Sequence, residues 1–193
     1  MNTPNKLTVL RIFLAPLYLL LLMIDFPHHY LVAGLVFGAA ALTDMFDGKI
    51  ARKYNLITNF GKFLDPLADK MLTTAAFLGF LAMGRIDVWA VMLILTREFM
   101  VTSVRLLAAK DGTVIAASFA GKLKTVMQFV AIIFMMVALE WQSLVSLLPS
   151  IPAPAFSIPL TVGHVLVWVS VVFTMISGFE YVWNCRKYFS DAK

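Results

Sequence analysis

The stretch that decides the architecture covers residues 44–69 and reads DMFDGKIARKYNLITNFGKFLDPLAD. It holds two pairs of aspartates at helical spacing, Asp44 with Asp47 and Asp65 with Asp69. Residues three or four positions apart share one face of a helix. Because the intervening residues can turn the chain back, we expect two neighbouring helices that each present two carboxylates toward one point.

Small residues accompany the aspartates. Gly48 and Ala51 fall on the face of the first pair, and Gly61 lies one turn before Asp65. Small side chains let helix backbones and a bulky ligand approach closely. A single aspartate of this kind would be an ordinary residue at a helix end, but four of them interleaved with small residues and Arg52 favour a binding site.

The rest of the chain is strongly apolar. Of its 193 residues, 61% are hydrophobic and 14% are charged, against about 45–50% and about 25% in a soluble domain. This surplus indicates a bilayer and excludes a disordered chain, a coiled coil or a typical soluble enzyme. The one cysteine, Cys185, excludes an intramolecular disulfide and a cysteine-based zinc site. We assign the net charge of +5 to anionic membrane lipids rather than nucleic acid.

The apolar segments do not alternate as barrel strands do, and Leu, Ala, Met and Phe dominate them. They predict an all-α integral membrane protein with six transmembrane helices in a single domain, residues 1–193. The expected helices are approximately 5–24, 29–53, 60–84, 87–109, 118–140 and 160–185. We expect the last helix to start only near Leu160, because four prolines precede it.

Lysine and arginine orient these helices. Thirteen of the 16 fall at the termini or in the second and fourth connections: Lys6, Arg11, Lys49, Arg52, Lys53, Lys62, Arg105, Lys110, Lys122, Lys124, Arg186, Lys187 and Lys193. This bias predicts that both termini are cytoplasmic. We expect the first helix to be retained rather than cleaved as a signal peptide, since no small-residue cleavage site follows it.

Four carboxylates in one apolar cleft repel each other, and divalent cations relieve that repulsion. Oxygen-only ligands favour Mg²⁺, Mn²⁺ or Ca²⁺ over zinc. Two such ions would balance four aspartates, and a pair about 3.5–4 Å apart suits in-line displacement at phosphorus. Arg52 and nearby lysines could balance the further charge of a bridging diphosphate.

The pattern Asp-x2-Asp-Gly-x2-Ala-Arg-x8-Gly-x3-Asp-x3-Asp resembles the signature of the CDP-alcohol phosphotransferases, and every position is matched. The resemblance implies a six-helix membrane fold, a homodimer and a site for two Mg²⁺ or Mn²⁺ ions held by Asp44, Asp47, Asp65 and Asp69. It also implies that Asp69 is the catalytic base that deprotonates the attacking alcohol. The CDP-lipid would be bordered by Asp47, Gly48, Ala51, Arg52, Gly61 and Asp65.

Two further stretches resemble the bacterial phosphatidylglycerophosphate synthases, a branch of that family. They are residues 2–16, NTPNKLTVLRIFLAP, and residues 97–128, REFMVTSVRLLAAKDGTVIAASFAGKLKTVMQ. The resemblance implies transfer of a phosphatidyl group from CDP-diacylglycerol to the C1 hydroxyl of sn-glycerol 3-phosphate. It implies a bacterial inner membrane with the active site facing the cytoplasm.

The residues themselves favour an anionic acceptor. Glu98, Thr102 and Arg105 form one helical stripe, and a second stripe consists of Ser118, Lys122, Thr125 and Gln128. Such stripes offer the cations and hydroxyls that a phosphate needs. We expect the acceptor phosphate to be bound by Arg105, Lys122, Arg97 and Lys124, with Asn5, Thr8 and Ser118 as further candidates.

Three alternatives stay open. The acceptor could be another alcohol, such as inositol phosphate. The aspartates could belong to a divalent-cation transporter, although transporters place such sites near the midplane, often in inverted repeats, and no repeat is visible. Finally, Arg97 could simply pair with Glu98 or Glu180, while Lys122 and Lys124 extend toward lipid head groups.

Overall fold

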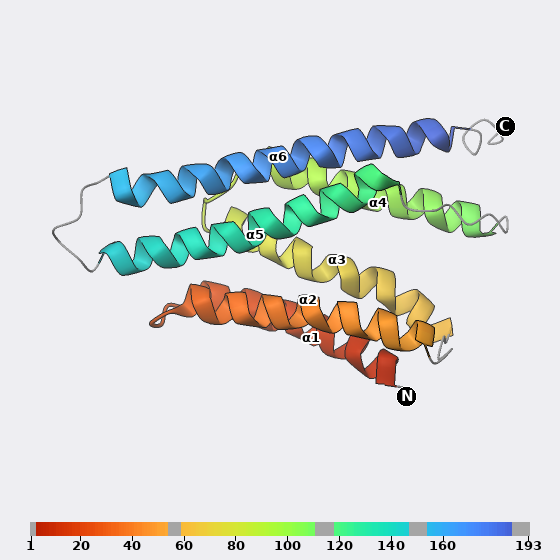
Figure 1. Cartoon of the computed structure of the whole chain (residues 1–193), viewed down its shortest axis with the longest axis horizontal. Coiled ribbons are helices and arrows are strands. Elements are labelled where there is room, and N and C mark those ends of the chain that lie inside the picture. The colour runs from red at the N-terminus through yellow and green to blue at the C-terminus, as the bar shows by residue number, and fades with distance from the viewer. Residues whose placement is uncertain (1–2, 54–58, 111–117, 147–153, 187–193) are drawn as a thin grey trace.

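The computed structural model of the chain describes residues 3–53, 59–110, 118–146 and 154–186. The elements in these ranges are α-helices: α1 (Thr3–Met23), α2 (His29–Lys53), α3 (Asn59–Ala82), α4 (Val88–Lys110), α5 (Phe119–Ser146) and α6 (Pro154–Asn184). Successive helices run in alternating directions (Figure 1). The starts of α1, α3 and α5 and the ends of α2, α4 and α6 therefore lie at one end of the bundle. We call it the aspartate end, and the other the opposite end.

The helices form two groups that meet along the middle of the molecule. α1 packs on α2 and α3, α6 packs on α5 and α4, and contacts of α2 and α3 with α5 and of α3 with α4 join the groups. Aromatic rings mark this junction. The Phe37 ring lies 5.6 Å from the Tyr18 ring and 5.5 Å from the Phe129 ring. These contacts link α1, α2 and α5, and close packing of this kind fixes how the two groups sit together.

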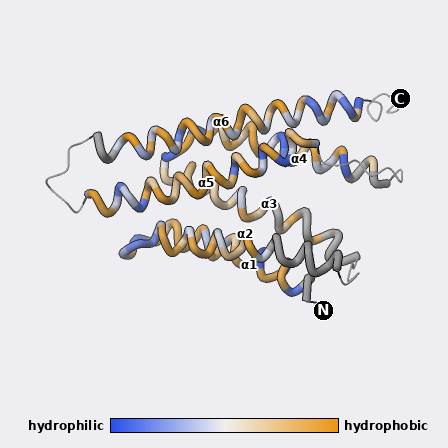
Figure 2. Tube along the Cα trace, viewed as in Figure 1, coloured by the Kyte–Doolittle hydropathy of each residue, from blue (hydrophilic) through white to orange (hydrophobic). Residues whose placement is uncertain are grey.

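The outward faces of the helices are also apolar. Large side chains such as Phe13, Leu35, Trp89 and Phe179 are between 66% and 71% exposed. Hydrophobic residues run along every helix, and hydrophilic ones gather toward the helix ends (Figure 2). Exposing so much apolar surface to water would cost about 25 cal/mol per Å². The outer surface of the bundle is therefore suited to lipid.

Three helices are long and apolar enough to cross a membrane, by length and composition: residues 6–23 of α1, 119–146 of α5 and 157–184 of α6. α2 and α3 carry shorter apolar stretches, residues 29–43 and 70–82. Their remaining turns hold the aspartate motif, and charges also interrupt α4. Three of the six expected spans thus meet this criterion among the residues that the structure describes.

The boundaries of α5 and α6 differ from expectation. α6 begins at Pro154 rather than near Leu160, so the predicted start is wrong by six residues, and α5 continues to Ser146 instead of ending at 140. Proline is favourable at the first helical position, where its missing N–H has no partner in any helix. Pro159 removes one internal hydrogen bond, and α6 tolerates this loss because it packs along α5.

A carboxylate from α5 closes the start of α2 at the opposite end. His28 adopts the left-handed conformation, with φ of 61°, a region in which histidine is enriched. Its Nδ1 lies 2.6 Å from Glu140 Oε1, and the Leu31 N–H donates to Glu140 Oε2 at 3.2 Å. Glu140 thereby caps α2, since the first N–H groups of a helix lack internal partners.

The close approach of α1 to α3 depends on Gly79. A Cβ at this position would lie 2.5 Å from Leu22 Cδ2 and 3.1 Å from Leu19 Cδ1. We predict that Gly79→Leu forces α1 away from α3 and destabilises the fold by about 1–3 kcal/mol, the usual cost of overpacking. Thermal unfolding in detergent measures the effect.

Gly38→Leu is the matched control, because it makes the same exchange within α2 where nothing lies within 4 Å of the added Cβ. Equal unfolding temperatures for the two variants would contradict the tight α1–α3 contact.

Candidate active site

The backbone places all four motif aspartates at the aspartate end. Asp44 and Asp47 lie in the second half of α2, and Asp65 and Asp69 lie in the first half of α3. Their side chains fall outside the described residues, as do those of Gly48, Ala51, Arg52 and Gly61. The expected metal and CDP-lipid contacts therefore stay predictions. The two helices that carry the motif both pack on α1 and make only limited contact with each other.

A cavity of about 430 Å³ opens among α3, α4 and α5 near this end. Its lining begins on α3 with Lys70, the residue after Asp69, and with Thr73, one helical turn beyond Asp69. The polar residues of the lining are Lys70, Thr73, Arg97, Glu98, Thr102, Arg105, Lys122, Lys124, Thr125 and Gln128. Both expected stripes thus contribute to one cavity. Its five basic side chains against one acidic side chain make it suited to an anion.

Glu98 organises the basic residues of the cavity. Its Oε1 lies 3.2 Å from Arg97 Nη1 and also forms an ion pair with Lys124 Nζ. Its backbone carbonyl accepts a hydrogen bond of 3.0 Å from Lys70 Nζ. The side chains of Arg97, Lys124 and Glu98 are only 7%, 7% and 14% exposed. Buried charges are stable only when they are paired and hydrogen-bonded. Both cations are paired with Glu98, while Arg97 Nε has no hydrogen-bond partner among the described residues.

The network extends to α6 through Arg97. Arg97 Nη2 donates to Ser177 Oγ at 2.7 Å, and a Cβ at Gly178 would lie 2.9 Å from Arg97 Cγ. The glycine lets the backbone of α6 pass close to the stem of the arginine. One turn deeper along α5, Gln128 Nε2 donates to Thr174 Oγ1 at 3.2 Å. α6 is thereby held against the cavity wall at two levels.

Arg105 and Lys122 are in a different situation. Arg105 Nε donates to the Tyr181 hydroxyl at 3.3 Å, and its guanidinium lies 5.4 Å from the centre of that ring. Lys122 is exposed at the cavity. Neither side chain pairs with a carboxylate in the part of the chain that the structure describes. Their N–H groups therefore remain available to a ligand.

The four cations expected at the acceptor phosphate thus divide into two pairs. Arg97 pairs with Glu98, as one alternative foresaw, so its charge is partly offset by a carboxylate that it shares with Lys124. Lys124 is 5% exposed and pairs with the same carboxylate, so the alternative that it extends toward lipid head groups is wrong. Arg105 and Lys122 keep free donors.

The further candidates are placed differently. Ser118 Oγ accepts a hydrogen bond of 3.1 Å from the Gly121 N–H, so this side chain caps α5. Thr8 and Arg11 are buried, on a helix that packs against α2 and α3. The side chain of Asn5 lies outside the described residues.

Sequence reasoning missed the parts played by Lys70, Ser177 and Tyr181. Lys70 carried a usable signal, since a lysine within an apolar helix and directly after the last motif aspartate needs a partner. The sequence gives no signal that selects Ser177 and Tyr181, because α6 has other hydroxyl residues at similar spacing.

Fold and cavity together define an α-helical protein of apolar helices with a predominantly basic cavity at one end of the bundle. The chain belongs to the CDP-alcohol phosphatidyltransferase family, whose model matches residues 1–176. This confirms the resemblance carried by the aspartate motif.

Its relatives share one type of name. A CDP-diacylglycerol–glycerol-3-phosphate 3-phosphatidyltransferase of Bacillus subtilis (strain 168) is 38% identical over 192 residues, 93% of each chain. One of Rickettsia bellii is 35% identical over 188 residues, 97% of each chain. A probable phosphatidylglycerophosphate synthase of Mycobacterium tuberculosis is 40% identical over 185 residues, 94% of this chain and 80% of that one.

One solved structure is similar in fold. It is the crystal structure of a phosphatidylinositol phosphate synthase from Mycobacterium tuberculosis in its apo form, with a TM-score of 0.56 and 21% identity. The match covers 94% of this chain and 90% of that one. It confirms the predicted all-helical architecture.

The central role of Glu98 can be tested by Glu98→Gln. The change leaves Arg97 and Lys124 buried without a counter-charge, and breaking a buried pair costs about 3–5 kcal/mol. We predict a markedly lower unfolding temperature in detergent, followed by fluorescence-detected size exclusion.

Glu180→Gln is the control, since Glu180 lies on the neighbouring α6 and makes no ion pair among the described residues. An equal loss of stability in both variants would show that Glu98 has no special role.

Proposed function

We propose that the chain transfers the phosphatidyl group of CDP-diacylglycerol to the C1 hydroxyl of sn-glycerol 3-phosphate, giving phosphatidylglycerophosphate and CMP. The observation that carries the proposal is the basic cavity whose α3 wall, at Lys70 and Thr73, directly follows Asp69. A phosphate-bearing acceptor needs such a cavity next to the base that activates its hydroxyl. The names of the relatives support the same reaction.

We further propose that all six helices cross a bacterial inner membrane as one catalytic domain, residues 1–193, with both termini in the cytoplasm. The start of α1 and the end of α6 lie at the same end of the bundle (Figure 1), and the basic cavity is lined by residues near that end, which supports this topology. The basic residues of the second and fourth connections belong to that end, as the positive-inside rule requires. A homodimer, expected from the family resemblance, completes the proposal.

The donor set suits divalent cations. Asp44, Asp47, Asp65 and Asp69 offer only carboxylate oxygens, which Mg²⁺ and Mn²⁺ prefer. Among the side chains that the structure describes, no other group of three or more histidine, cysteine, aspartate or glutamate residues gathers. When bound, two such ions would stabilise the charge that develops on the leaving CMP.

The residues of the chain perform the remaining tasks. Arg105 and Lys122 bind the phosphate of the acceptor and so direct its C1 hydroxyl toward α3. Asp69 accepts the hydroxyl proton, the oxygen forms a bond to the lipid-side phosphorus, and the bond from that phosphorus to the CMP oxygen breaks. Arg52 with its small neighbours Gly48, Ala51 and Gly61 borders the CDP group. Positioning and charge neutralisation supply the catalysis.

Removal of the base tests the assignment of Asp69. We predict that Asp69→Asn lowers the turnover number by about 10²–10⁴, the usual contribution of a general base. Binding of CDP-diacylglycerol should be partly retained, because the amide keeps the shape of the side chain. Release of labelled CMP and equilibrium lipid binding measure the two effects, and normal turnover would exclude Asp69 as the base.

The division of the cavity cations gives a second prediction. Lys122→Gln and Arg105→Gln each remove a charged donor to the acceptor phosphate, which is worth about tenfold or more. We expect the KM for glycerol 3-phosphate to rise by about that factor, with the KM for CDP-diacylglycerol little changed.

Lys6→Gln is the matched control, because Lys6 is an exposed lysine at the same end and is absent from the cavity lining. A KM that rises in the control as well would indicate a general charge effect instead of a phosphate site.

The reaction as a whole is tested with the purified chain, CDP-diacylglycerol, Mg²⁺ or Mn²⁺ and a panel of labelled alcohols. We expect a lipid product with glycerol 3-phosphate and little with uncharged alcohols. A product formed only with inositol phosphate would reassign the acceptor. Metal flux into sealed liposomes without CDP-lipid would favour the transporter alternative.

A further inference from the structure

A second cavity lies at the opposite end of the bundle, far from the aspartate motif. It has a volume of about 670 Å³ and is bounded by the α3–α4 turn, the end of α5 and the first half of α6. None of its lining residues belongs to the cavity at the aspartate end. The proposed reaction gives it no role.

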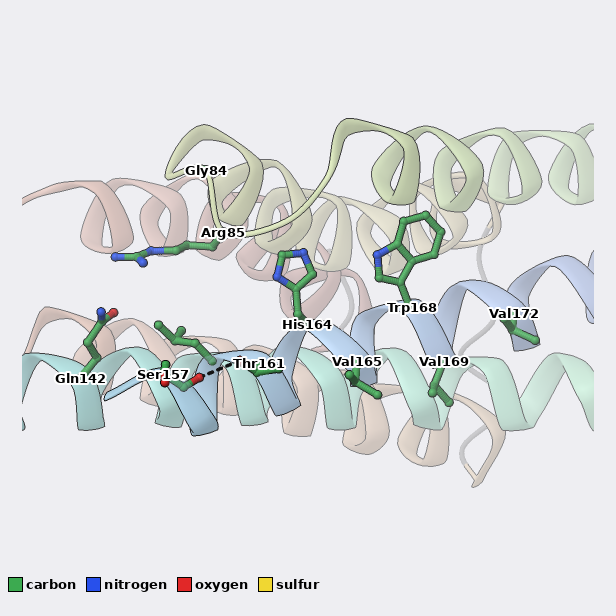
Figure 3. A pocket seen from close by; sticks show the side chains of 11 residues that line it. Gly84, Arg85, Gln142, Ser157, Thr161, His164, Val165, Trp168, Val169 and Val172 are labelled. Carbon is green, nitrogen blue, oxygen red and sulfur yellow. Dashed lines mark hydrogen bonds between the residues drawn. The ribbon is translucent and has the colours of Figure 1, made fainter. Parts of the chain in front are cut away.

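The polar part of this second cavity contains an unneutralised cation. The Arg85 guanidinium extends over the cavity toward the Gln142 amide (Figure 3). Arg85 Nε is buried without a hydrogen-bond partner, and no ion pair of this side chain occurs among the described residues. The nearby carboxylate of Asp87 contacts two other residues of the lining instead of Arg85, since its Oδ2 lies 3.3 Å from His164 Nε2 and 3.2 Å from Trp168 Nε1. Arginine stays charged at any physiological pH, so this site is suited to an anion.

The apolar part of the same cavity follows α6 toward the middle of the bundle. His164 and Trp168 project toward the α3–α4 turn, and Val169 and Val172 continue the lining (Figure 3). Val172 lies eight residues, about 12 Å along the helix, beyond His164. These residues belong to a helix that is long and apolar enough to cross a membrane. The apolar lining therefore extends to the depth of lipid acyl chains.

The combination of a free arginine at the membrane edge with an apolar track along the helix matches one kind of ligand. A free phosphate would fill only the polar part. A lipid without a phosphate would leave Arg85 without a counter-charge, and a zwitterionic phospholipid would bring its own cation close to Arg85. We propose that this cavity binds one anionic phospholipid from the leaflet at the opposite end. Its phosphate contacts Arg85 and Gln142, and one acyl chain lies along Trp168, Val169 and Val172.

Trp168 supplies a local probe for this lipid, because bromine on an acyl chain quenches a tryptophan at close range. The full chain is reconstituted with Trp168 as its one tryptophan, the other three (Trp89, Trp141 and Trp183) being replaced by phenylalanine. Two kinds of vesicle are compared. One contains brominated phosphatidylglycerol in unbrominated phosphatidylcholine, and the other contains brominated phosphatidylcholine in unbrominated phosphatidylglycerol. We expect about a tenfold preference for the anionic lipid at Trp168, the value of a charge-assisted hydrogen bond.

Arg85→Gln should abolish this preference. Arg186→Gln should retain it, since Arg186 is an exposed arginine at the aspartate end whose guanidinium lies over the Trp183 ring. Retained transferase activity shows that each variant is folded. If the triple tryptophan replacement is inactive, native mass spectrometry of the otherwise unaltered chain makes the same comparison, with loss of one bound phosphatidylglycerol expected in Arg85→Gln alone.

Several results would overturn the proposal. Equal quenching by the two lipids in the protein that retains Arg85 would show that the cavity does not select anionic lipid. This measurement tests the proposal even if Arg85→Gln does not fold. A preference that survives Arg85→Gln would place the anion elsewhere. Absence of quenching by either lipid would show that a second copy of the chain covers the cavity.

Discussion

The buried carboxylate of Glu98 is the interaction on which the site depends. Arg97 and Lys124 approach the same oxygen, Lys70 binds the backbone carbonyl of the same residue, and Arg97 continues to Ser177. One acidic residue thus joins α3, α4, α5 and α6 at a single point. In an apolar bundle such charges cannot rely on water for solvation, so the network must be complete for the helices to remain together.

This arrangement also explains why a cavity with five basic side chains can exist. Repulsion among these cations would favour open helices if nothing opposed it. Glu98 offsets part of the charge of the two most buried ones, Arg97 and Lys124, and leaves the positive charge of Arg105 and Lys122 directed at the open space. The cations that link the helices of the cavity wall are therefore different residues from the cations that are available to an anion, although all of them line one cavity.

The two ends of the bundle differ in a related way. At the aspartate end, the motif and the basic cavity supply opposite charges on adjacent helices, and the proposed reaction depends on both. At the opposite end, the polar residues act locally: Glu140 caps α2, and Asp87 binds His164 and Trp168. Arg85 departs from that pattern, because it makes no ion pair within the described part of the chain, and for this reason we propose a second site there.

The sequence by itself determined the membrane character, the helical class, the family and the identity of the motif residues, because these follow from composition and from local spacing. It also selected the stripes of Glu98 and Lys122 that face the cavity, since helical periodicity fixes which residues share a face. It could not separate Arg97 and Lys124 from Arg105 and Lys122. That division depends on which side chains from α3, α4, α5 and α6 meet, and distances between helices are set by packing alone. For the same reason the start of α6 at Pro154 was decided by its contact with α5, which outweighs the local cost of Pro159.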